Sequence, residues 1–251
     1  MPETILSTEK IYQPFKKLAD PLLACAFSSR QHQNMSLFYG ETRESLNNRK
    51  NFLSQLGINY QDLVCAKQIH AGFTRYVKAE DKGKGASSYD TAMPQTDAFV
   101  TDEKNLPLAI FTADCLSIFL YDSLKPAIGL IHSGWRSTKE CIAAKTVKLM
   151  RELFSTEPKD LYAAFGPAIR SCCYEVEKNF RDFFSYGLNQ KDGRYYLDLV
   201  QINKKQLIDL GLKENNILDS QICTSCRHEE FFSYRKEGKT CARLMSVIML
   251  K

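Results

Sequence analysis

The sequence lacks any long apolar run. Spanning a bilayer takes roughly 20 consecutive apolar residues. The 251-residue sequence contains no stretch approaching that length, so we expect no membrane segment. The first ten residues, Met1–Lys10, carry no apolar core, which predicts no secretory signal. Nine cysteines are an odd number that fits a disulfide framework poorly. We therefore expect reduced thiols and a cytoplasmic location.

A strong charge of one sign is also missing. The formal net charge is +5, and no basic stripe interleaved with aromatic residues is present. This charge is too weak to predict a nucleic-acid partner, but it suits a small anionic substrate such as phosphate. A hydrophobic content of 44% is ordinary for a globular protein and is ample for a hydrophobic core at this length.

Histidine is scarce, with only four in the chain. One of them, His132, ends a segment over residues 111–132 that is typical of a β-hairpin. Folding the segment about Ser123-Leu124 places Asp122 opposite Lys125, and Cys115 opposite His132. Directly opposed side chains of an antiparallel pair have Cβ atoms roughly 4.5–5.5 Å apart. The hairpin therefore predicts a thiol beside an imidazole.

Such a pair is either part of a metal site or a nucleophile with its base. A zinc enzyme site usually has three protein ligands and one open position. His70 ends an apolar stretch and is the candidate third ligand. The spacing of His70, Cys115 and His132 leaves both interpretations open at this point.

The residues after His132 predict an anion site. Ser137 to Glu140 form a capping-box pattern at a helix start, and Arg136 comes just before it. Unpaired N–H groups there could bind phosphate, or Ser137 could simply cap the helix. Asp114, next to Cys115, could move protons or orient a ligand histidine.

The remaining cysteines predict no second metal site. Cys223 and Cys226 form a Cys-x-x-Cys pair, but no matching pair is evident in the sequence. We expect the neighbouring Cys172 and Cys173 to serve in packing, because adjacent cysteines pair badly with each other.

Strands and helices alternate irregularly, and adjacent strands are joined by short loops. This predicts an α+β fold with mixed sheets, in a single domain over residues 1–251. The predicted strands are 98–100, 106–111, 116–121, 127–132, 161–165 and 244–250. The predicted helices are 42–56, 137–154, 176–184 and 200–210.

Six ordered motifs resemble those of the laccase-domain (YfiH-like) family, over about residue 27 to the C-terminus. The motifs are Gln68-Ile-His70, Thr112-Ala-Asp-Cys-Leu116, His132-Ser-Gly-Trp-Arg136, Gly166-Pro-Ala-Ile169, Cys173-Tyr-Glu-Val176 and Phe232-Ser-Tyr-Arg235. The family was first described as multicopper polyphenol oxidases and is now understood as purine nucleoside phosphorylases that also deaminate adenosine. The resemblance implies a β-sandwich flanked by helices.

The resemblance also implies a zinc site on His70, Cys115 and His132. Its implied substrates are adenosine, inosine, methylthioadenosine and phosphate, with no nucleic-acid or membrane partner, and we expect a monomer. Cys115 and Asp114 are the candidate catalytic residues. The candidate phosphate-binding residues are Arg30, Arg136, Arg170 and Arg235, with Arg136 first by its position.

Three other functions remain as hypotheses. The first is a copper oxidase. Four histidines without a His-x-His pair cannot build a multicopper centre, which disfavours a multicopper oxidase. A single copper site with two histidines and one cysteine is still possible. A metal-free hydrolase would use Cys115 as a nucleophile activated by His132. A zinc-stabilised interaction domain would turn over no nucleoside.

Overall fold

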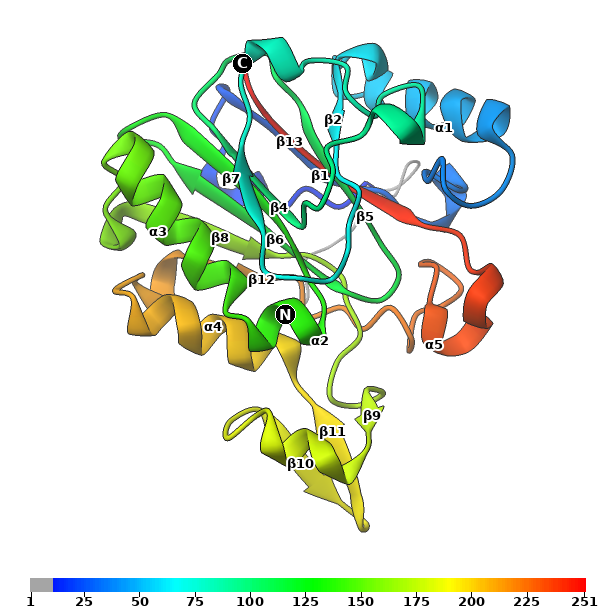
Figure 1. Ribbon diagram of the computed structural model, residues 1–251, viewed down its shortest axis with the longest axis vertical. Coiled ribbons are helices and arrows are strands. Elements are labelled where there is room, and N and C mark those ends of the chain that lie inside the picture. Colours follow the sequence, from blue (N-terminus) through cyan, green and yellow to red (C-terminus); the bar gives the residue numbers. More distant parts are fainter. Residues whose placement is uncertain (1–10) are drawn as a thin grey trace.

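Two β-sheets lie face to face at the centre of the computed structural model (Figure 1), which describes residues 11–251. The four-stranded sheet has the order β1 (Leu23–Phe27), β13 (Leu244–Leu250), β5 (Leu108–Thr112) and β2 (Val64–Cys65). The six-stranded sheet has the order β12 (Ile217–Asp219), β8 (Leu161–Phe165), β6 (Leu116–Asp122), β7 (Ala127–Ser133), β4 (Ala98–Thr101) and β3 (Thr74–Tyr76). The absence of a secretory signal was predicted from residues that lie outside the described range.

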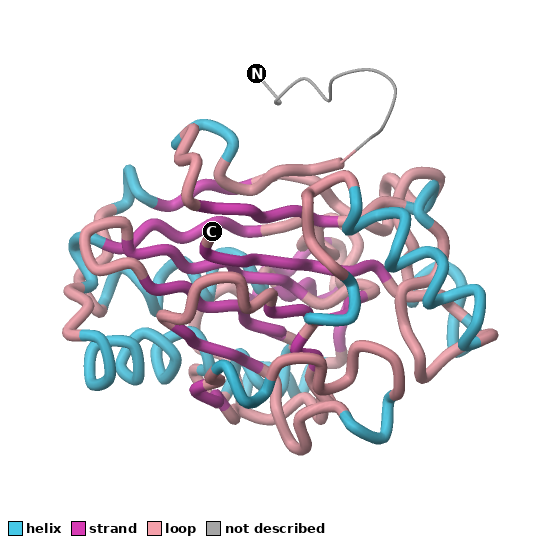
Figure 2. The backbone as a smooth tube through the Cα atoms, turned by 90° about the horizontal axis from the view of Figure 1, so that it is seen from above, coloured by secondary structure: helices cyan, strands magenta, loops and turns pink. Residues whose placement is uncertain are grey.

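Helices cover the outer face of each sheet (Figure 2). Helix α1 (Thr42–Ser54) buries Phe52 and Leu53 against the four-stranded sheet. Helices α3 (Ile142–Phe154) and α4 (Leu199–Asp209) pack on the six-stranded sheet. Apolar side chains of both sheets fill the space between them, which accounts for strands that are buried on both faces. The predicted α+β sandwich flanked by helices is confirmed.

A small third sheet projects from the lower end of the molecule in Figure 1. It consists of β10 (Leu188–Lys191), β11 (Arg194–Leu197) and β9 (Glu175–Val176). The helix predicted over residues 176–184 was wrong. Val176 instead pairs with Tyr195 of β11, and only a short 3-10 helix, Lys178–Asp182, follows.

The helix predicted over residues 137–154 is divided in two. Helix α2 (Trp135–Lys139) begins before the predicted start, and the N–H of Gly134 donates to the hydroxyl of Ser137 at 3.0 Å. Cys141 then adopts a left-handed conformation with φ 56°, which a continuous α-helix does not allow. Ser137 therefore lies inside the first turn of α2 and is not its N-cap.

The last helix, α5 (Tyr234–Glu237), is short.

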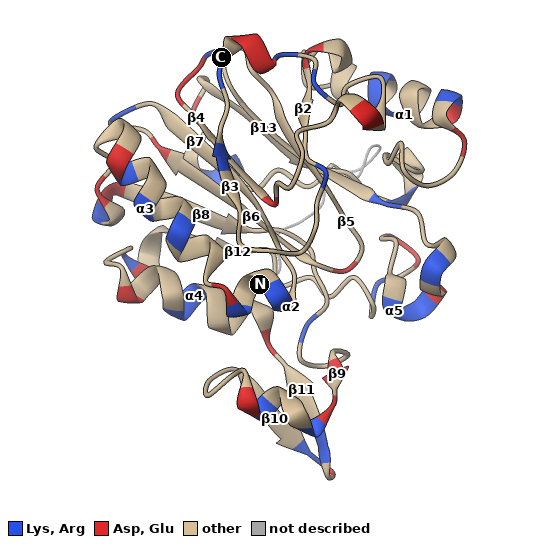
Figure 3. Cartoon of the chain, in the orientation of Figure 1, with Lys and Arg blue, Asp and Glu red and all other residues tan. Residues whose placement is uncertain are grey.

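No helix within residues 11–251 is long and apolar enough to cross a membrane. Helices α1, α3 and α4 each carry more Lys and Arg than Asp and Glu (Figure 3). The small net positive charge is thus distributed over these helices and is not concentrated on one of them.

Candidate metal centre and active site

The β6–β7 hairpin carries two of the candidate ligands, with a register different from the predicted one. Asp122 pairs with Ala127, and Ser117 pairs with His132, because the turn contains four residues and not two. Cys115 lies just before β6 and therefore diagonal to His132. A shift of two residues keeps every side chain on its original face. The thiol and the imidazole consequently still converge.

Gly134 provides the space that this diagonal approach needs. A Cβ atom built on Gly134 would lie 3.0 Å from the Cys115 sulfur and 3.2 Å from Cδ2 of His70. Both distances are shorter than nearly all real Cβ contacts. The missing side chain is what lets Cys115 and His70 meet in front of the strand end.

His70 comes from the loop between β2 and β3, which the neighbouring Gln68 anchors. The Gln68 amide donates to the carbonyl of Phe111 at 2.9 Å and accepts from its N–H at 2.7 Å. His70 itself has a left-handed backbone with φ 59°. This turn brings the imidazole of His70 against that of His132, with ring centroids 4.6 Å apart. His70 is exposed, whereas His132 is fully buried.

Asp97 organises both histidines, and the sequence patterns did not reveal it. Its buried carboxylate accepts the N–H groups of His70 and Ala71 at 2.9 and 2.8 Å. Oδ1 of Asp97 also lies 2.8 Å from Nδ1 of His132, which must donate if the carboxylate is ionised. Nε2 of His132 is then free to bind a metal, as in carboxylate–histidine–metal arrangements.

The electrostatics of this group favour a cation. Burial acts to raise the pKa of Cys115, but the charge and hydrogen bonds of His132 and His70 lower it to about 6. Burial acts to lower the pKa of His132, but the Cys115 thiolate and Asp97 raise it to about 9. Both shifts favour a thiolate beside an imidazolium. A metal ion bound between the two side chains can take the place of the imidazolium proton that faces the sulfur.

The donor atoms of His70, Cys115 and His132 all lie within 4.8 Å of one another. One thiolate and two imidazoles are a set that zinc accepts, and three ligands leave a fourth position for water or substrate. His70 is exposed and lines a cavity, so the cluster lies beside a space that a small molecule can enter. The residues therefore fit a metal ion with an open coordination site.

The cavity beside His70 has a volume of about 630 Å³, within the range of small-molecule sites. The guanidinium of Arg136 lies 4.4 Å from the ring centroid of Trp135. Among residues 11–251 it has no hydrogen-bond or ion-pair partner. The residues lining the cavity are His70, Ala71, Gly72, Phe73, Trp135, Arg136, Lys139, Glu140, Lys145 and Phe183. An unpaired cation and an aromatic face thus share one wall of the cavity.

Asp114 is buried at the start of β6 and holds two other segments. Its Oδ1 accepts the hydroxyl of Thr224 at 2.7 Å, and its Oδ2 accepts the N–H of Arg235 at 2.9 Å. Its carbonyl accepts the N–H of Ile169 at 3.0 Å. The carboxylate therefore fixes the chain around Cys115 to the segment before α5 and to the start of α5, and the carbonyl fixes it to the segment before β9.

The other three candidate arginines are engaged to different degrees. Arg30 donates to Glu237 at 2.6 Å and to two carbonyls. Arg170 makes a bidentate ion pair with Asp219, with N···O distances of 3.0 and 2.6 Å. Arg235 is exposed and donates to a single carbonyl at 2.9 Å. Arg136 is thus the least committed of the four candidates.

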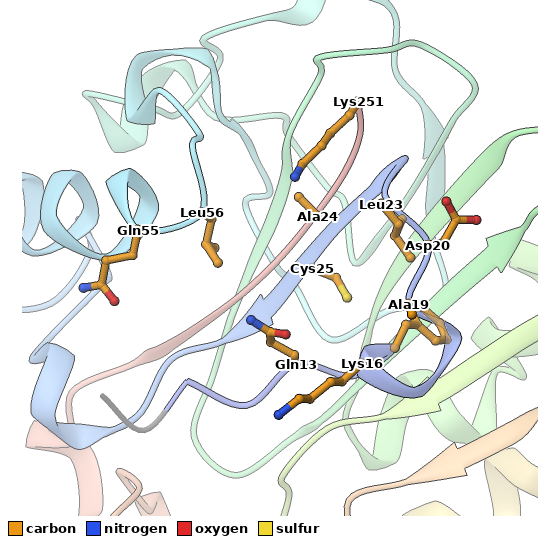
Figure 4. Close-up of a pocket in the computed structure, with 11 residues that line it drawn as sticks. Gln13, Lys16, Ala19, Asp20, Leu23, Ala24, Cys25, Gln55, Leu56 and Lys251 are labelled. Carbon is orange, nitrogen blue, oxygen red and sulfur yellow. The ribbon is translucent and has the colours of Figure 1, made fainter. Parts of the chain in front are cut away.

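A second hollow, of about 290 Å³, lies beside β1 (Figure 4). The described residues around it include no histidine, and its one thiol belongs to Cys25. Burial raises the pKa of that thiol to about 12, so it stays protonated. This hollow offers neither a metal site nor an activated nucleophile.

Residues 26–251 match the family described as multi-copper polyphenol oxidoreductase laccase. The chain belongs to this laccase family. The resemblance inferred from the motifs is confirmed, and the chain is an enzyme of that family.

Several relatives in the laccase family carry names that state an activity. One is the purine nucleoside phosphorylase YlmD of Geobacillus stearothermophilus, 35% identical over 86% of this chain and 82% of the relative. Another is the adenosine deaminase RL5 of an unknown prokaryotic organism, 30% identical over 82% of each chain. The crystal structure of the Geobacillus YlmD superposes with a TM-score of 0.88, at 31% identity, over 92% of this chain and 93% of that one.

Proposed function

We propose that this chain is a metal-dependent purine nucleoside phosphorylase that also deaminates adenosine. The observation that carries the proposal is a cluster of three metal-binding side chains, one of which, His70, lines a cavity that also contains the unpaired Arg136. Phosphorolysis needs an anion site and a group that stabilises charge on the leaving base, both within reach of one nucleoside. The named activities of two relatives support both reactions.

We propose zinc as the metal held by His70, Cys115 and His132. Two imidazoles and one thiolate are also ligands of single copper sites, but a multicopper centre needs more than the four histidines of this chain. When bound, the metal would supply a Lewis acid and activate water. Asp97 would fix the ring of His132 for this role through its bond at 2.8 Å.

Arg136 is the proposed phosphate-binding residue. A guanidinium can hold phosphate through two parallel hydrogen bonds, and that of Arg136 has no competing partner among residues 11–251. A phosphate oxygen would form a bond to C1′ of the ribose while the bond from C1′ to the base nitrogen breaks. The base leaves with the bonding electrons and takes up a proton. Trp135, on the same wall, packs against the Arg136 guanidinium and would hold it in place beside the nucleoside.

Asp114 is the proposed proton-transfer group, together with the Thr224 hydroxyl that donates to it. Cys115 is the proposed catalytic thiolate only as a metal ligand. Arg235 is a second candidate for phosphate, because it is exposed and makes one bond to a carbonyl. Arg30 and Arg170 are the last of the four candidates for phosphate, because their ion pairs with Glu237 and Asp219 compete with phosphate and neither residue lines the cavity.

Product analysis tests the proposal. The purified chain is incubated with adenosine or inosine, with and without phosphate. We expect adenine or hypoxanthine plus ribose-1-phosphate when phosphate is present, and inosine plus ammonia from adenosine when it is absent. His132→Ala should abolish both reactions because it removes a metal ligand.

His228→Ala is the matched control, because the His228 ring lies elsewhere and contacts Glu229 at 3.1 Å. It should retain both reactions. Turnover by His132→Ala equal to that of the wild type would refute the assigned site. No turnover of any nucleoside by the folded wild type would refute the proposed function.

Metal analysis separates the alternatives. Copper at one ion per chain with an intense visible thiolate band would favour the oxidase. Full activity after chelation, lost on alkylation of Cys115, would favour the metal-free hydrolase. The zinc proposal requires that chelation abolish activity and that zinc restore it.

The proposal includes three properties of the whole chain. We propose one domain over residues 1–251, a monomer, and action in the cytoplasm on small molecules only. Light scattering of the purified chain measures the mass, and a dimer would contradict the second of these.

A further inference from the structure

Four cysteines outside the candidate active site come together from two distant segments. Cys172 and Cys173 lie between β8 and β9, and Cys223 and Cys226 lie between β12 and α5. Their sulfur atoms are all within 4.8 Å of one another. We call this group the four-cysteine cluster. The matching pair that the sequence did not reveal is therefore present in space.

The sulfur positions suit a tetrahedral metal ion. The sulfur of Cys226 lies 3.6 Å from that of Cys172 and 3.3 Å from that of Cys173. The sulfurs of Cys172 and Cys173 are 3.9 Å apart. In a tetrahedral zinc site with Zn–S bonds of about 2.3 Å, neighbouring sulfurs are about 3.8 Å apart. The cluster thus has nearly the required dimensions without rearrangement of the backbone.

Backbone hydrogen bonds hold the two segments together. The N–H of Ala168 donates to the carbonyl of Ile222 at 3.2 Å, and the N–H of Thr224 donates to the carbonyl of Ala168 at 3.1 Å. Within the Cys-x-x-Cys turn, the N–H of Arg227 donates to the carbonyl of Cys223 at 3.0 Å. The thiols are therefore brought together by the fold itself.

We propose that the four-cysteine cluster binds one zinc ion as a closed structural site. Four protein sulfurs complete the coordination shell, so no position remains for water or substrate. The ion would join the segment before β9 to the segment before α5. Thr224 and Arg235, which hold Asp114, lie in or after the second of these segments. The site would therefore stabilise the surroundings of the active site without taking part in the reaction.

The test measures zinc in a chain whose first metal site has been removed. The full-length His132→Ala variant is purified under reducing conditions, stripped with a chelator and titrated with Zn²⁺ alone. We expect about one zinc ion bound per chain. Co²⁺ in place of Zn²⁺ should give the visible absorption of tetrahedral thiolate coordination.

Adding Cys226→Ser to this background should reduce zinc binding at least about tenfold, because three sulfurs hold zinc much less tightly than four. Adding Cys141→Ser is the matched control, because that cysteine is exposed and outside the cluster. It should leave binding unchanged. Zinc should raise the Tm of the control by roughly 5–10 °C and that of the Cys226→Ser chain by much less.

Three results would overturn the proposal. The reduced His132→Ala chain could bind no zinc, or the Cys226→Ser chain could bind as much as the control. The third is a mass lower by two hydrogen atoms in the chain as isolated from cells, with Cys173 joined to Cys226, which would identify a disulfide. None of these results depends on whether the chain cleaves nucleosides, because none uses activity.

Discussion

The two sulfur-containing clusters of this molecule differ in almost every respect that matters for chemistry. The first, His70, Cys115 and His132, is built on the β6–β7 hairpin and the loop between β2 and β3, contains two imidazoles, and is fixed by the buried Asp97. The four-cysteine cluster is built on two loops, contains only sulfur, and includes the exposed Cys172 and Cys226 among its members. Three ligands leave a position open, whereas four close the shell.

The number of metal-binding side chains in each cluster, and the residues around them, distinguish a site suited to catalysis from one suited to a structural role. The three-donor cluster adjoins a cavity of about 630 Å³ with the unpaired Arg136 in its wall. The four-cysteine cluster instead bridges loops whose backbones already pair. The first arrangement is suited to turnover and the second to holding a surface together.

Parallel serine substitutions give the largest expected contrast. Cys115→Ser should lower kcat/KM for phosphorolysis by about 10³-fold, since the Lewis acid supplies several kcal/mol. Cys226→Ser should leave it within about threefold, because that sulfur contacts neither the cavity nor the three ligands. Steady-state assays of both variants in the presence of zinc measure this. Equal losses in the two variants would remove the distinction.

Asp97→Asn tests the support of the three-donor cluster. The amide keeps the shape but removes the charge that holds Nδ1 of His132, and outer-shell changes of this kind cost about 10–100-fold in metal affinity. A competition titration with a zinc-binding dye measures the affinity, and the binding of the second equivalent serves as an internal control. Loss of both equivalents would indicate general unfolding instead.

Two arginines sharpen the contrast between binding and structure. Arg136→Ala should raise the KM for phosphate about 10-fold, since a charge-assisted hydrogen bond contributes about 1.5–3 kcal/mol. Arg170→Ala should instead lower the Tm, because it breaks the ion pair with Asp219 and a bond to the carbonyl of Ile222. Kinetics at varied phosphate and thermal unfolding of each variant are the measurements. A higher KM for Arg170→Ala than for Arg136→Ala would reverse the assignment.

The smallest expected effect is a pH dependence beside α5. Burial acts to raise the pKa of Glu237, but the N–H of Ser233 and the guanidinium of Arg30 lower it. A depressed carboxyl pKa stabilises the fold above the unfolded value of about 4.3 and loses that contribution as the pH falls through the folded value.

Glu237→Gln should therefore reduce the free energy of unfolding by about 1 kcal/mol or less at neutral pH, and by almost nothing near pH 3. Urea unfolding of the wild type and the variant across this range measures the difference. A difference that grows as the pH falls would contradict the expected direction.

Sequence patterns were sufficient for the mixed sheets, and the family resemblance supplied the sandwich and the three-donor cluster. The apolar runs of β6, β7 and β13 marked strands, and hairpin geometry brought Cys115 near His132. The register was wrong because it depends on the length of the turn, which the residues alone did not fix.

Asp97 and the four-cysteine cluster were missed for a different reason. Asp97 faces His132 through the pairing of β4 with β7, and a single carboxylate before an apolar strand was its only signal. Cys173 and Cys226 are 53 residues apart and meet because β8 and β12 run parallel, followed by the bridge between Ala168 and Cys223. Such long-range parallel pairing has no local pattern in the sequence.

The four-residue turn of the β6–β7 hairpin has a consequence for which changes of its length the site can accept. Alternate residues of β7 face opposite cores, with His132 on the side of Leu130 and Ile128, between the sheets. Lengthening the turn by an even number of residues would preserve that orientation. An odd insertion that propagates into β7 would turn the imidazole toward α3. Whether the number of inserted residues is even or odd, and not the length of the turn itself, therefore decides whether His132 keeps its orientation.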